Sequence, residues 1–213
     1  MKLTKYVHSC ILYESVGLRV LLDPGSFARK SHLLPVKKLE SLDYIVLTHE
    51  HGDHYDESLL RSLAERQPHA VIVTNDDLAE KIKPLNLPNP IQVGSDEIVT
   101  VFEAAHEPLP LGMPNVRNIG VHIGDKFTHP GDSFAFSHTR EVLALPMTGP
   151  WGSLKDALGK VVKLKPKIVI PVHDWEWHKA AREVRYAMSK KLLEPHNIDF
   201  IEPENATPLS FKL

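Results

Sequence analysis

The sequence predicts a fold of the α/β or α+β class with layered packing. Short apolar runs of strand length recur in both halves of the chain, and segments with a helical apolar stripe flank them. The composition is that of an ordinary globular protein, with 213 residues, 42% hydrophobic and 24% charged. No internal repeat or linker interrupts the pattern, so a single domain over residues 1–213 is expected.

Composition and charge also limit the classes of function. The net charge of -2 supplies no basic field for nucleic acid, so no nucleic-acid partner is expected. No run approaches the ~18 apolar residues of a membrane span, and the start of the chain lacks a signal peptide's apolar stretch. Cys10 is the single cysteine, which excludes an intramolecular disulfide and fits a reducing compartment. A cytoplasmic protein is therefore expected.

The first half of the chain alternates strands with helices. Strands are expected at 9–14, 18–22, 43–47 and 70–74, with a turn at 15–17 and a stop at Asp23-Pro24-Gly25. Asp56 is a candidate N-cap for a helix whose apolar stripe is Leu59, Leu60 and Leu63. A further helix is expected at 76–83, because Pro84 cannot continue it.

The second half continues the alternation. Strands are expected at 91–93, 98–104, 117–123, 126–128, 142–146 and 167–172 and near Ile198 and Leu209, with a proline-rich loop at 107–118. A capping-box-like start at Ser153 predicts a helix. A longer helix is expected from Glu176 to about Leu192. Its apolar spacing predicts an inner face of Trp177, Ala181, Val184 and Met188 and a solvated face of Lys179, Arg182 and Arg185.

The most informative motif is His49-Glu50-His51-Gly52-Asp53-His54, which directly follows a predicted buried strand. Neutral imidazole and ionised carboxylate are ligand types that zinc and similar metals prefer. Residues two apart in an extended segment project from the same side, so His49 and His51 can bind one ion. Asp53 and His54 follow where the chain turns, and they can point to a second ion nearby.

Further candidate ligands end later strands. His106 follows the strand at 98–104, Asp132 follows the strand at 126–128, and His173 ends the strand at 167–172. Each is a metal-ligand type at the point where a strand enters a loop, the position where functional residues concentrate. Their ordered recurrence after the histidine cluster indicates a metal centre with ligands from several strand ends.

With these motifs the chain resembles the metallo-β-lactamase superfamily. The segments that carry the resemblance are 22–25, 48–54, His106, Gly131-Asp132-Ser133 and Pro171-Val172-His173. The resemblance implies a four-layer αβ/βα sandwich. It also implies one ion bound by His49, His51 and His106 and a second by Asp53, His54 and His173, with Asp132 bridging both. Asp23 would orient a metal-bound histidine.

Within that superfamily the chain is similar to a small bacterial branch. The similar segments are 7–9, 128–133 and 145–149, although Val7 stands where that branch usually has glycine. The branch contains metal-dependent hydrolases and is related to L-ascorbate-6-phosphate lactonase and to N-acylphosphatidylethanolamine-hydrolysing phospholipase D.

The resemblance implies hydrolysis of a small-molecule substrate by a hydroxide that two divalent ions activate. The attacked centre would be an ester, lactone, amide or phosphodiester. Asp53 is a candidate for orienting the attacking water or taking its proton, and His8 and His178 are candidates for protonating the leaving group. His129 is expected to be a structural hydrogen-bonding residue. Trp151 and Trp175 could contact substrate or pack in the core.

Other readings stay open at the level of sequence. A mononuclear iron dioxygenase would use overlapping ligand motifs, whereas His51 argues against a diiron redox enzyme. A nuclease is disfavoured by the charge balance, and a non-catalytic metal-binding protein by the complete set of seven ligands. Zinc suits the histidine-rich set, but manganese, iron or nickel could occupy it. The substrate and the oligomeric state are not readable from the sequence.

Overall fold

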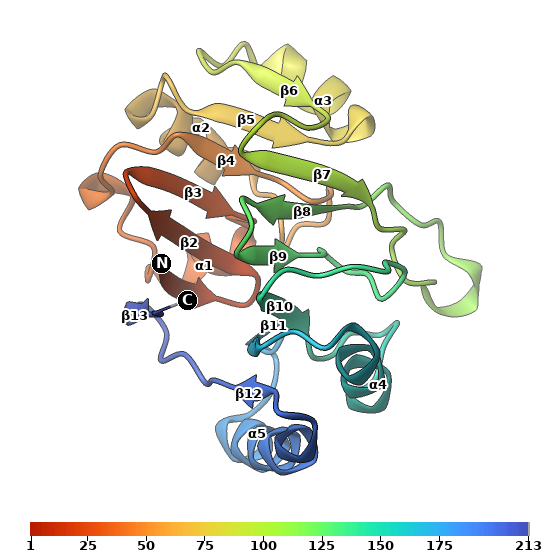
Figure 1. The fold of residues 1–213 in the computed structure, drawn as a ribbon. Coiled ribbons are helices and arrows are strands. Elements are labelled where there is room, and N and C mark those ends of the chain that lie inside the picture. Colours follow the sequence, from red (N-terminus) through yellow and green to blue (C-terminus); the bar gives the residue numbers. More distant parts are fainter. Residues whose placement is uncertain (213) are drawn as a thin grey trace. The chain divides into compact units, whose positions relative to one another are not determined.

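Two β-sheets organise the chain in the computed structural model, which describes residues 1–212 (Figure 1). Each sheet belongs to its own compact unit, one formed by Met1–Gly94 with the segment from Pro203 onward, the other by Ser95–Glu202. Helices flank each sheet, so the expected mixed α/β class is confirmed. No helix among residues 1–212 has both the length and the apolar content that crossing a membrane requires.

Over the described residues, the first unit holds a seven-stranded sheet in the order β13-β1-β2-β3-β4-β5-β6. Its strands are β1 (Lys2–Val7), β2 (Cys10–Ser15), β3 (Leu18–Leu22), β4 (Tyr44–Val46), β5 (Val71–Thr74), β6 (Ile91–Val93) and β13 (Leu209–Ser210). Its helices are α1 (Ser26–Ser31), α2 (Glu57–Arg66) and α3 (Asp76–Ile82). β1 and β3 both run antiparallel to β2, while β3 to β6 run parallel to one another. The carboxyl ends of β1, β3, β4 and β5 therefore share one edge of the sheet.

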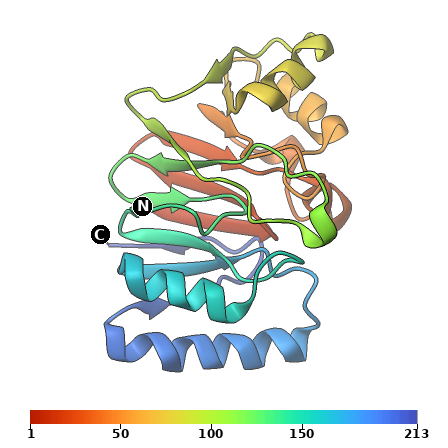
Figure 2. The same ribbon diagram turned by 90° about the vertical axis from the view of Figure 1, so that its right-hand side faces the viewer.

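Over the same described range, the second unit holds a six-stranded sheet in the order β12-β11-β10-β9-β8-β7. Its strands are β7 (Val99–Glu103), β8 (Ile119–Ile123), β9 (Phe127–His129), β10 (Val142–Pro146), β11 (Ile168–Val172) and β12 (Asp199–Phe200). Its helices are α4 (Leu154–Leu164) and α5 (Lys179–Leu193), which lie side by side in Figures 1 and 2. β7, β9, β10 and β11 point the same way, so their carboxyl ends also share one edge.

Local sequence signals account for several element boundaries. β3, β6 and β10 begin and end where the sequence predicts. The Asp56 carboxylate caps α2 by accepting from the Leu59 N–H at 2.9 Å, and Ser153 with Asp156 forms a complete capping box on α4. These caps satisfy backbone donors that the first helical turn leaves without an intrahelical partner.

Two elements of the first unit lack a clear sequence signal. β1 contains Lys2 and Lys5, although Lys5 is 3% exposed, and these charges break the alternation that marks a half-buried strand. α1 is only six residues long, and its N-cap Gly25 offers no side-chain hydrogen bond. Neither element was expected from the sequence.

The predicted inner face of α5 is wrong for two of its four residues. Trp177 and Ala181 are partly buried, but Val184 is 63% and Met188 48% exposed. The buried residues of the helix are Tyr186, Ser189 and Leu193. The Tyr186 hydroxyl donates to the buried Asp174 carboxylate, and its ring meets that of Phe200 at 5.3 Å. This buried polar contact fixes the rotation of the helix, which apolar spacing alone does not specify.

The arginines of α5 also differ from expectation. Arg182 and Arg185, predicted to lie on a solvated face, are both half-buried. Arg182 donates to the Trp177 carbonyl, and the Arg185 guanidinium lies 4.7 Å from the Trp177 ring centroid. Arg185 thus covers an aromatic ring and Arg182 binds a backbone carbonyl, contacts that a count of charges does not anticipate.

Candidate metal centre

In the first unit, candidate ligands collect at the shared carboxyl edge of the sheet. His8 follows β1, Asp23 follows β3, and the loop of residues 49–54, here called the histidine loop, follows β4. His8, Asp23, His49 and His54 are almost fully buried, each at most 2% exposed. Buried imidazoles and carboxylates at the ends of parallel strands are an arrangement typical of a functional site in an α/β sheet.

His49 and His51 lie together as their spacing predicts. His49 Nε2 is 3.1 Å from His51 Nδ1, and the two ring centroids are 4.8 Å apart. Two imidazole nitrogens at this separation can face a single ion. His51 is half-buried and His49 fully buried, so the pair spans the boundary between interior and solvent.

Asp53 and His54 form a second group, and His8 joins them. The three residues offer ligand atoms that lie within 4.8 Å of one another. Asp53 Oδ2 is 3.1 Å from His8 Nε2 and 3.7 Å from His54 Nε2. The Asp53 carboxylate is thus between two imidazoles, and His8 contacts a predicted ligand directly.

Asp23 and Thr48 orient the buried histidines. Asp23 Oδ2 is 2.7 Å from His54 Nδ1 and accepts from the Thr48 hydroxyl at 2.9 Å, while Asp23 Oδ1 accepts from the Thr48 N–H at 2.8 Å. A carboxylate can only accept, so His54 Nδ1 carries the proton and Nε2 presents its lone pair. Thr48 donates its hydroxyl hydrogen to Asp23 and therefore accepts from His49 Nδ1 at 3.0 Å. His49 therefore carries its proton on Nδ1 and presents the lone pair of Nε2, and this is the tautomer that can bind a metal through Nε2.

The histidine loop rests directly on the segment after β3. The Ser26 N–H donates to the Gly52 carbonyl at 2.7 Å. A Cβ at Gly25 would lie 1.9 Å from the Asp53 carbonyl oxygen, so only glycine allows the two backbones to approach this closely. The Asp23-Pro24-Gly25 motif therefore both orients His54 and supports the loop that carries it.

In the second unit, His106, Asp132 and His173 also lie at the shared carboxyl edge. Asp132 Oδ2 is 3.1 Å from His173 Nε2 and 3.7 Å from His106 Nε2. All three residues are at most 4% exposed. One carboxylate between two imidazoles is an arrangement that can bridge two ions.

Backbone contacts position these three residues. His106 Nδ1 lies 2.6 Å from the Glu107 carbonyl, an acceptor, so Nδ1 carries the proton and Nε2 faces Asp132 as a lone-pair donor. Asn118 donates to the carbonyls of Ala104 and Pro130 at 2.6 and 2.9 Å, and its own carbonyl accepts from the Asp132 N–H at 3.2 Å. Asn118 thereby joins the ends of the strands that deliver His106 and Asp132.

Trp151 lies beside the histidines of the second unit. Its ring centroid is 5.3 Å from that of His173 and 6.0 Å from that of His106, both edge to face. A Cβ at Gly149 would lie 2.4 Å from Trp151 Cε2, so the glycine makes room for the indole. Trp151 is half-buried and packs on the proposed ligands, and its exposed part could also contact a substrate.

Within each unit, these groups fit a divalent transition metal. The donors are buried imidazole nitrogens and carboxylate oxygens, and second partners fix His49, His54 and His106 as Nε2 donors. Clustering several such groups without a cation would place polar atoms in a poorly solvated region at considerable cost. Cys10 belongs to neither group of side chains that lie close enough to share an ion, and burial, with the Asp23 charge, raises the pKa of its thiol well above its usual value.

His178 and His129 have other local roles. His178 is exposed and forms the N-cap of α5, where its Nδ1 accepts from the Ala180 N–H at 3.4 Å. The sequence placed it inside the helix, which in fact begins at Lys179. His129 is fully buried, and its Nδ1 accepts from the Gly131 N–H at 3.1 Å, so it shapes the turn before Asp132.

Sequence reasoning missed Thr48 and Asn118 as positioning residues. Thr48 belongs to the recognised motif, and its place directly before His49 is a usable signal. Asn118 offers none, because its three hydrogen bonds reach backbone groups 12 to 14 residues away along the chain. Only the folded loops bring these groups together.

The geometry defines a metal-binding α/β protein, and comparison with known proteins places it in a family. A family model described as "Beta-lactamase superfamily domain" matches residues 2–173. The chain is 29% identical to Protein Rv0786c of Mycobacterium tuberculosis over 97% of this chain and 98% of that protein. It is 28% identical to a UPF0173 metal-dependent hydrolase of Staphylococcus saprophyticus, over 81% and 85% of the two chains.

A solved structure shows the same fold. Igni18, described as a metallo hydrolase from Ignicoccus hospitalis, superposes with a TM-score of 0.70 at 17% identity, covering 100% of this chain and 98% of that one. The chain belongs to the metallo-β-lactamase superfamily, as its motifs indicate.

Proposed function

We propose that this chain, a metal-dependent hydrolase of the metallo-β-lactamase superfamily, uses two divalent ions to cleave an ester, lactone or phosphodiester bond in a small molecule. The observation that supports this proposal most directly is that each unit gathers buried imidazoles and a carboxylate at the carboxyl edge of its own sheet. Two staphylococcal relatives, 28% and 29% identical over 81% of this chain, are named metal-dependent hydrolases, which supports the same class of chemistry.

The proposed ligand set combines the two units. His49, His51 and His106 would hold one ion, Asp53, His54 and His173 would hold the other, and Asp132 would bridge them. The two units would then act as one metallo-hydrolase domain. The histidine-rich set favours zinc, with manganese, iron or nickel as alternatives.

When bound, two such ions supply Lewis acidity and a water whose pKa is lowered toward neutrality. The protein's part is to hold the nucleophile and the scissile group in place. The network from Asp23 through Thr48 keeps His49 and His54 in single tautomers, which limits reorganisation during the reaction.

Asp53 and His8 are the proposed proton-handling pair, since Asp53 Oδ2 and His8 Nε2 are 3.1 Å apart. Asp53 would orient the attacking water or take its proton, and His8 would return a proton to the leaving group. His178 is a weaker candidate for protonating the leaving group, because it is exposed and caps α5. Full turnover in Asp53→Ala at complete metal occupancy would exclude the Asp53 role.

The loop after His106 is the proposed substrate wall. Leu111 is 104% and Met113 60% exposed, so this loop presents apolar side chains to solvent. Apolar side chains that extend from a loop next to a ligand suit the non-reacting part of a small organic substrate. A cytoplasmic location belongs to the same proposal and rests on Cys10 being the only cysteine.

The test combines metal analysis with a substrate screen. Protein purified without added metal should contain close to two divalent ions per chain and should hydrolyse at least one lactone, ester or phosphodiester. His106→Ala and Asp132→Asn should lose metal and activity together, whereas His69→Ala, at an exposed histidine, should lose neither. Iron with dioxygen-dependent turnover and no hydrolysis would favour the dioxygenase alternative and contradict the proposal.

A further inference from the structure

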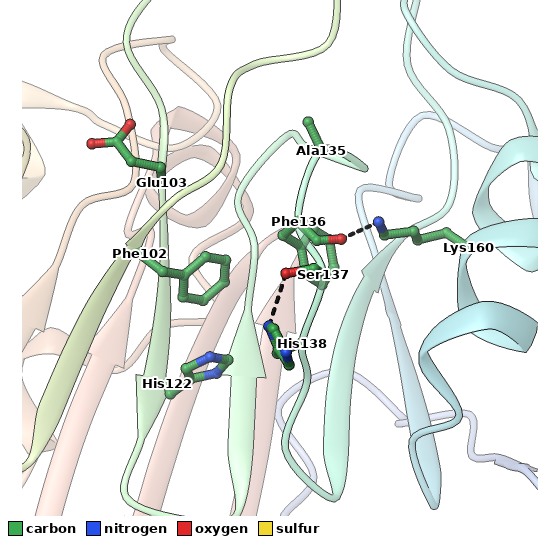
Figure 3. Close-up of a pocket in the computed structure, with 8 residues that line it drawn as sticks. All are labelled: Phe102, Glu103, His122, Ala135, Phe136, Ser137, His138 and Lys160. Atoms are coloured by element: carbon green, nitrogen blue, oxygen red, sulfur yellow. Dashed lines mark hydrogen bonds between the residues drawn. The ribbon is translucent and has the colours of Figure 1, made fainter.

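The second unit contains a cavity of about 430 Å³ that the proposed hydrolase site does not use (Figure 3). Its walls come from β7, β8, α4 and the segment of residues 135–138. None of the seven proposed metal ligands lines it. The volume falls within the range of small-molecule pockets, about 300–1,000 Å³.

An aromatic platform forms one side of this cavity. The Phe102 and His122 rings stack with centroids 4.5 Å apart and planes 27° from parallel. Phe102 pairs in register with Gly120, and a Cβ at Gly120 would lie 2.2 Å from Phe102 Cζ. Glycine therefore allows the Phe102 ring to lie close to the sheet, and Figure 3 shows this ring directed into the cavity.

A second aromatic ring and a cation line the cavity beside this platform. The Phe136 ring centroid is 5.8 Å from that of Phe102. Lys160 Nζ lies 4.8 Å from the Phe136 centroid and donates to the Phe136 carbonyl (Figure 3). The Phe136 carbonyl accepts one hydrogen bond, and the Lys160 ammonium group has three hydrogens, so this group can also donate to a ligand.

Lys160 supplies the ammonium charge among the residues that line the cavity. Burial lowers the pKa of Lys160 and the Lys163 charge lowers it further, while the Glu107 charge raises it. Burial also lowers the pKa of His122 to about 4, with a contribution from the Arg140 charge, so its imidazole is neutral at neutral pH. Glu103 lies at the exposed rim, 86% accessible, within 3.6 Å of Arg117. An anion inside the cavity could pair with the partly buried Lys160 ammonium group.

We propose that this cavity binds a planar aromatic carboxylate, with its ring against Phe102 and Phe136 and its carboxylate on Lys160. Stacking on these rings selects for a flat aromatic group, because offset and edge-to-face ring contacts stabilise beyond buried area alone. The Lys160 ammonium selects for the anion. The proposal concerns binding only and stands independently of the proposed hydrolase function.

The test is calorimetric titration of the purified protein with 2-naphthoate and with its neutral analogue 2-naphthalenemethanol. Wild-type protein should bind 2-naphthoate saturably, with a Kd near or below about 1 mM, and should bind the alcohol several-fold more weakly. Lys160→Met should weaken 2-naphthoate binding about tenfold, because it removes the charge and keeps most of the stem. Lys163→Met, at an exposed lysine one helical turn further along α4, should bind like wild type.

Several outcomes would overturn the proposal. These are no saturable binding, equal affinity for acid and alcohol, or an unchanged affinity in Lys160→Met. A carboxylate can also bind a metal ion, so His106→Ala is titrated in parallel. Binding that His106→Ala abolishes and Lys160→Met leaves intact would assign the acid to the metal centre instead. Circular dichroism of each variant checks that the fold is retained, and Ser137→Ala provides a second, milder change in the same cavity.

Discussion

At the scale of single residues, the candidate site contains hydrogen bonds that select one tautomer of three buried histidines. His49, His54 and His106 each have Nδ1 directed at an oxygen acceptor, which leaves the Nε2 lone pair available to a metal. The acceptors differ in kind: a threonine hydroxyl, the Asp23 carboxylate and a backbone carbonyl. The motif supplies the imidazoles, and these partners decide which nitrogen is available to a metal.

Thr48→Val tests the threonine in this network. Valine keeps the side-chain shape but removes the acceptor of His49 Nδ1 and one donor to Asp23. We expect metal affinity to fall about 10- to 100-fold, as is usual when an orienting partner is lost. Competition titration with a chromophoric chelator measures it, with Thr207→Val at an exposed threonine as the control. Equal affinities in the two variants would show that His49 does not need Thr48.

At the scale of elements, α5 shows how a buried polar contact can override an apolar pattern. The spacing of Trp177, Ala181, Val184 and Met188 predicts a buried stripe, yet Val184 and Met188 are exposed. The face that is buried carries Tyr186 and Ser189, two polar side chains whose hydroxyls donate to Asp174 and to the Arg185 carbonyl. The Ser189 bond lies within the helix, so only the Tyr186 contact depends on how the helix is rotated. A helix near the surface can rotate so that one hydroxyl finds an acceptor, at a modest loss of apolar burial.

Paired variants on α5 test this rotation. Tyr186→Phe removes the donor to the buried Asp174 and should lower the free energy of unfolding by about 1–3 kcal/mol. Met188→Ser, on the exposed side, should change it by less than about 0.5 kcal/mol. Urea denaturation followed by circular dichroism measures both. A larger cost for Met188→Ser than for Tyr186→Phe would mean that the helix packs on the stripe its sequence predicts.

At the scale of the whole molecule, stability should depend on metal, because the proposed ligands come from widely separated parts of the chain. An ion that binds only the folded state adds about 4 kcal/mol at a thousandfold excess over its Kd. Treatment with EDTA should therefore lower Tm, and added zinc should restore it. The double variant His49→Ala and His51→Ala should show a smaller response in the same thermal scan. An unchanged Tm after verified metal removal would argue against the proposed site.

Stability should also fall in mild acid, and His122 is one defined cause. Its pKa is lowered from 6.5 to about 4, first by burial and then by the charges of Arg140 and His138, so the fold favours its neutral form. As pH drops, His122 is protonated in the unfolded chain before it is protonated in the folded one. The contribution of its neutral form to the free energy of unfolding is therefore present above about pH 6.5 and is lost between pH 6.5 and 4. The difference in free energy of unfolding between wild type and His122→Phe, measured as a function of pH, isolates the contribution of His122. A difference that stays constant from pH 7 to 4 would show that His122 does not titrate in this way.

The sequence by itself determined the class of the fold, most strand positions, the caps at Asp56 and Ser153, and the ligand types at the strand ends. These features rest on local periodicity, on capping chemistry and on residues adjacent in the chain, such as those of the histidine loop. Side chains at strand ends also indicated the site, because parallel strands bring their carboxyl ends to one edge.

The tertiary structure alone decided which partner orients each imidazole and which face of α5 is buried. It also decided that Asn118 joins the strand ends that carry His106 and Asp132, and that Gly25 lets the histidine loop approach the segment after β3. Each of these depends on backbone groups and side chains distant in sequence meeting at hydrogen-bonding distance. No periodicity in the chain encodes such a meeting, because it is fixed only when buried polar groups find their partners in the folded state.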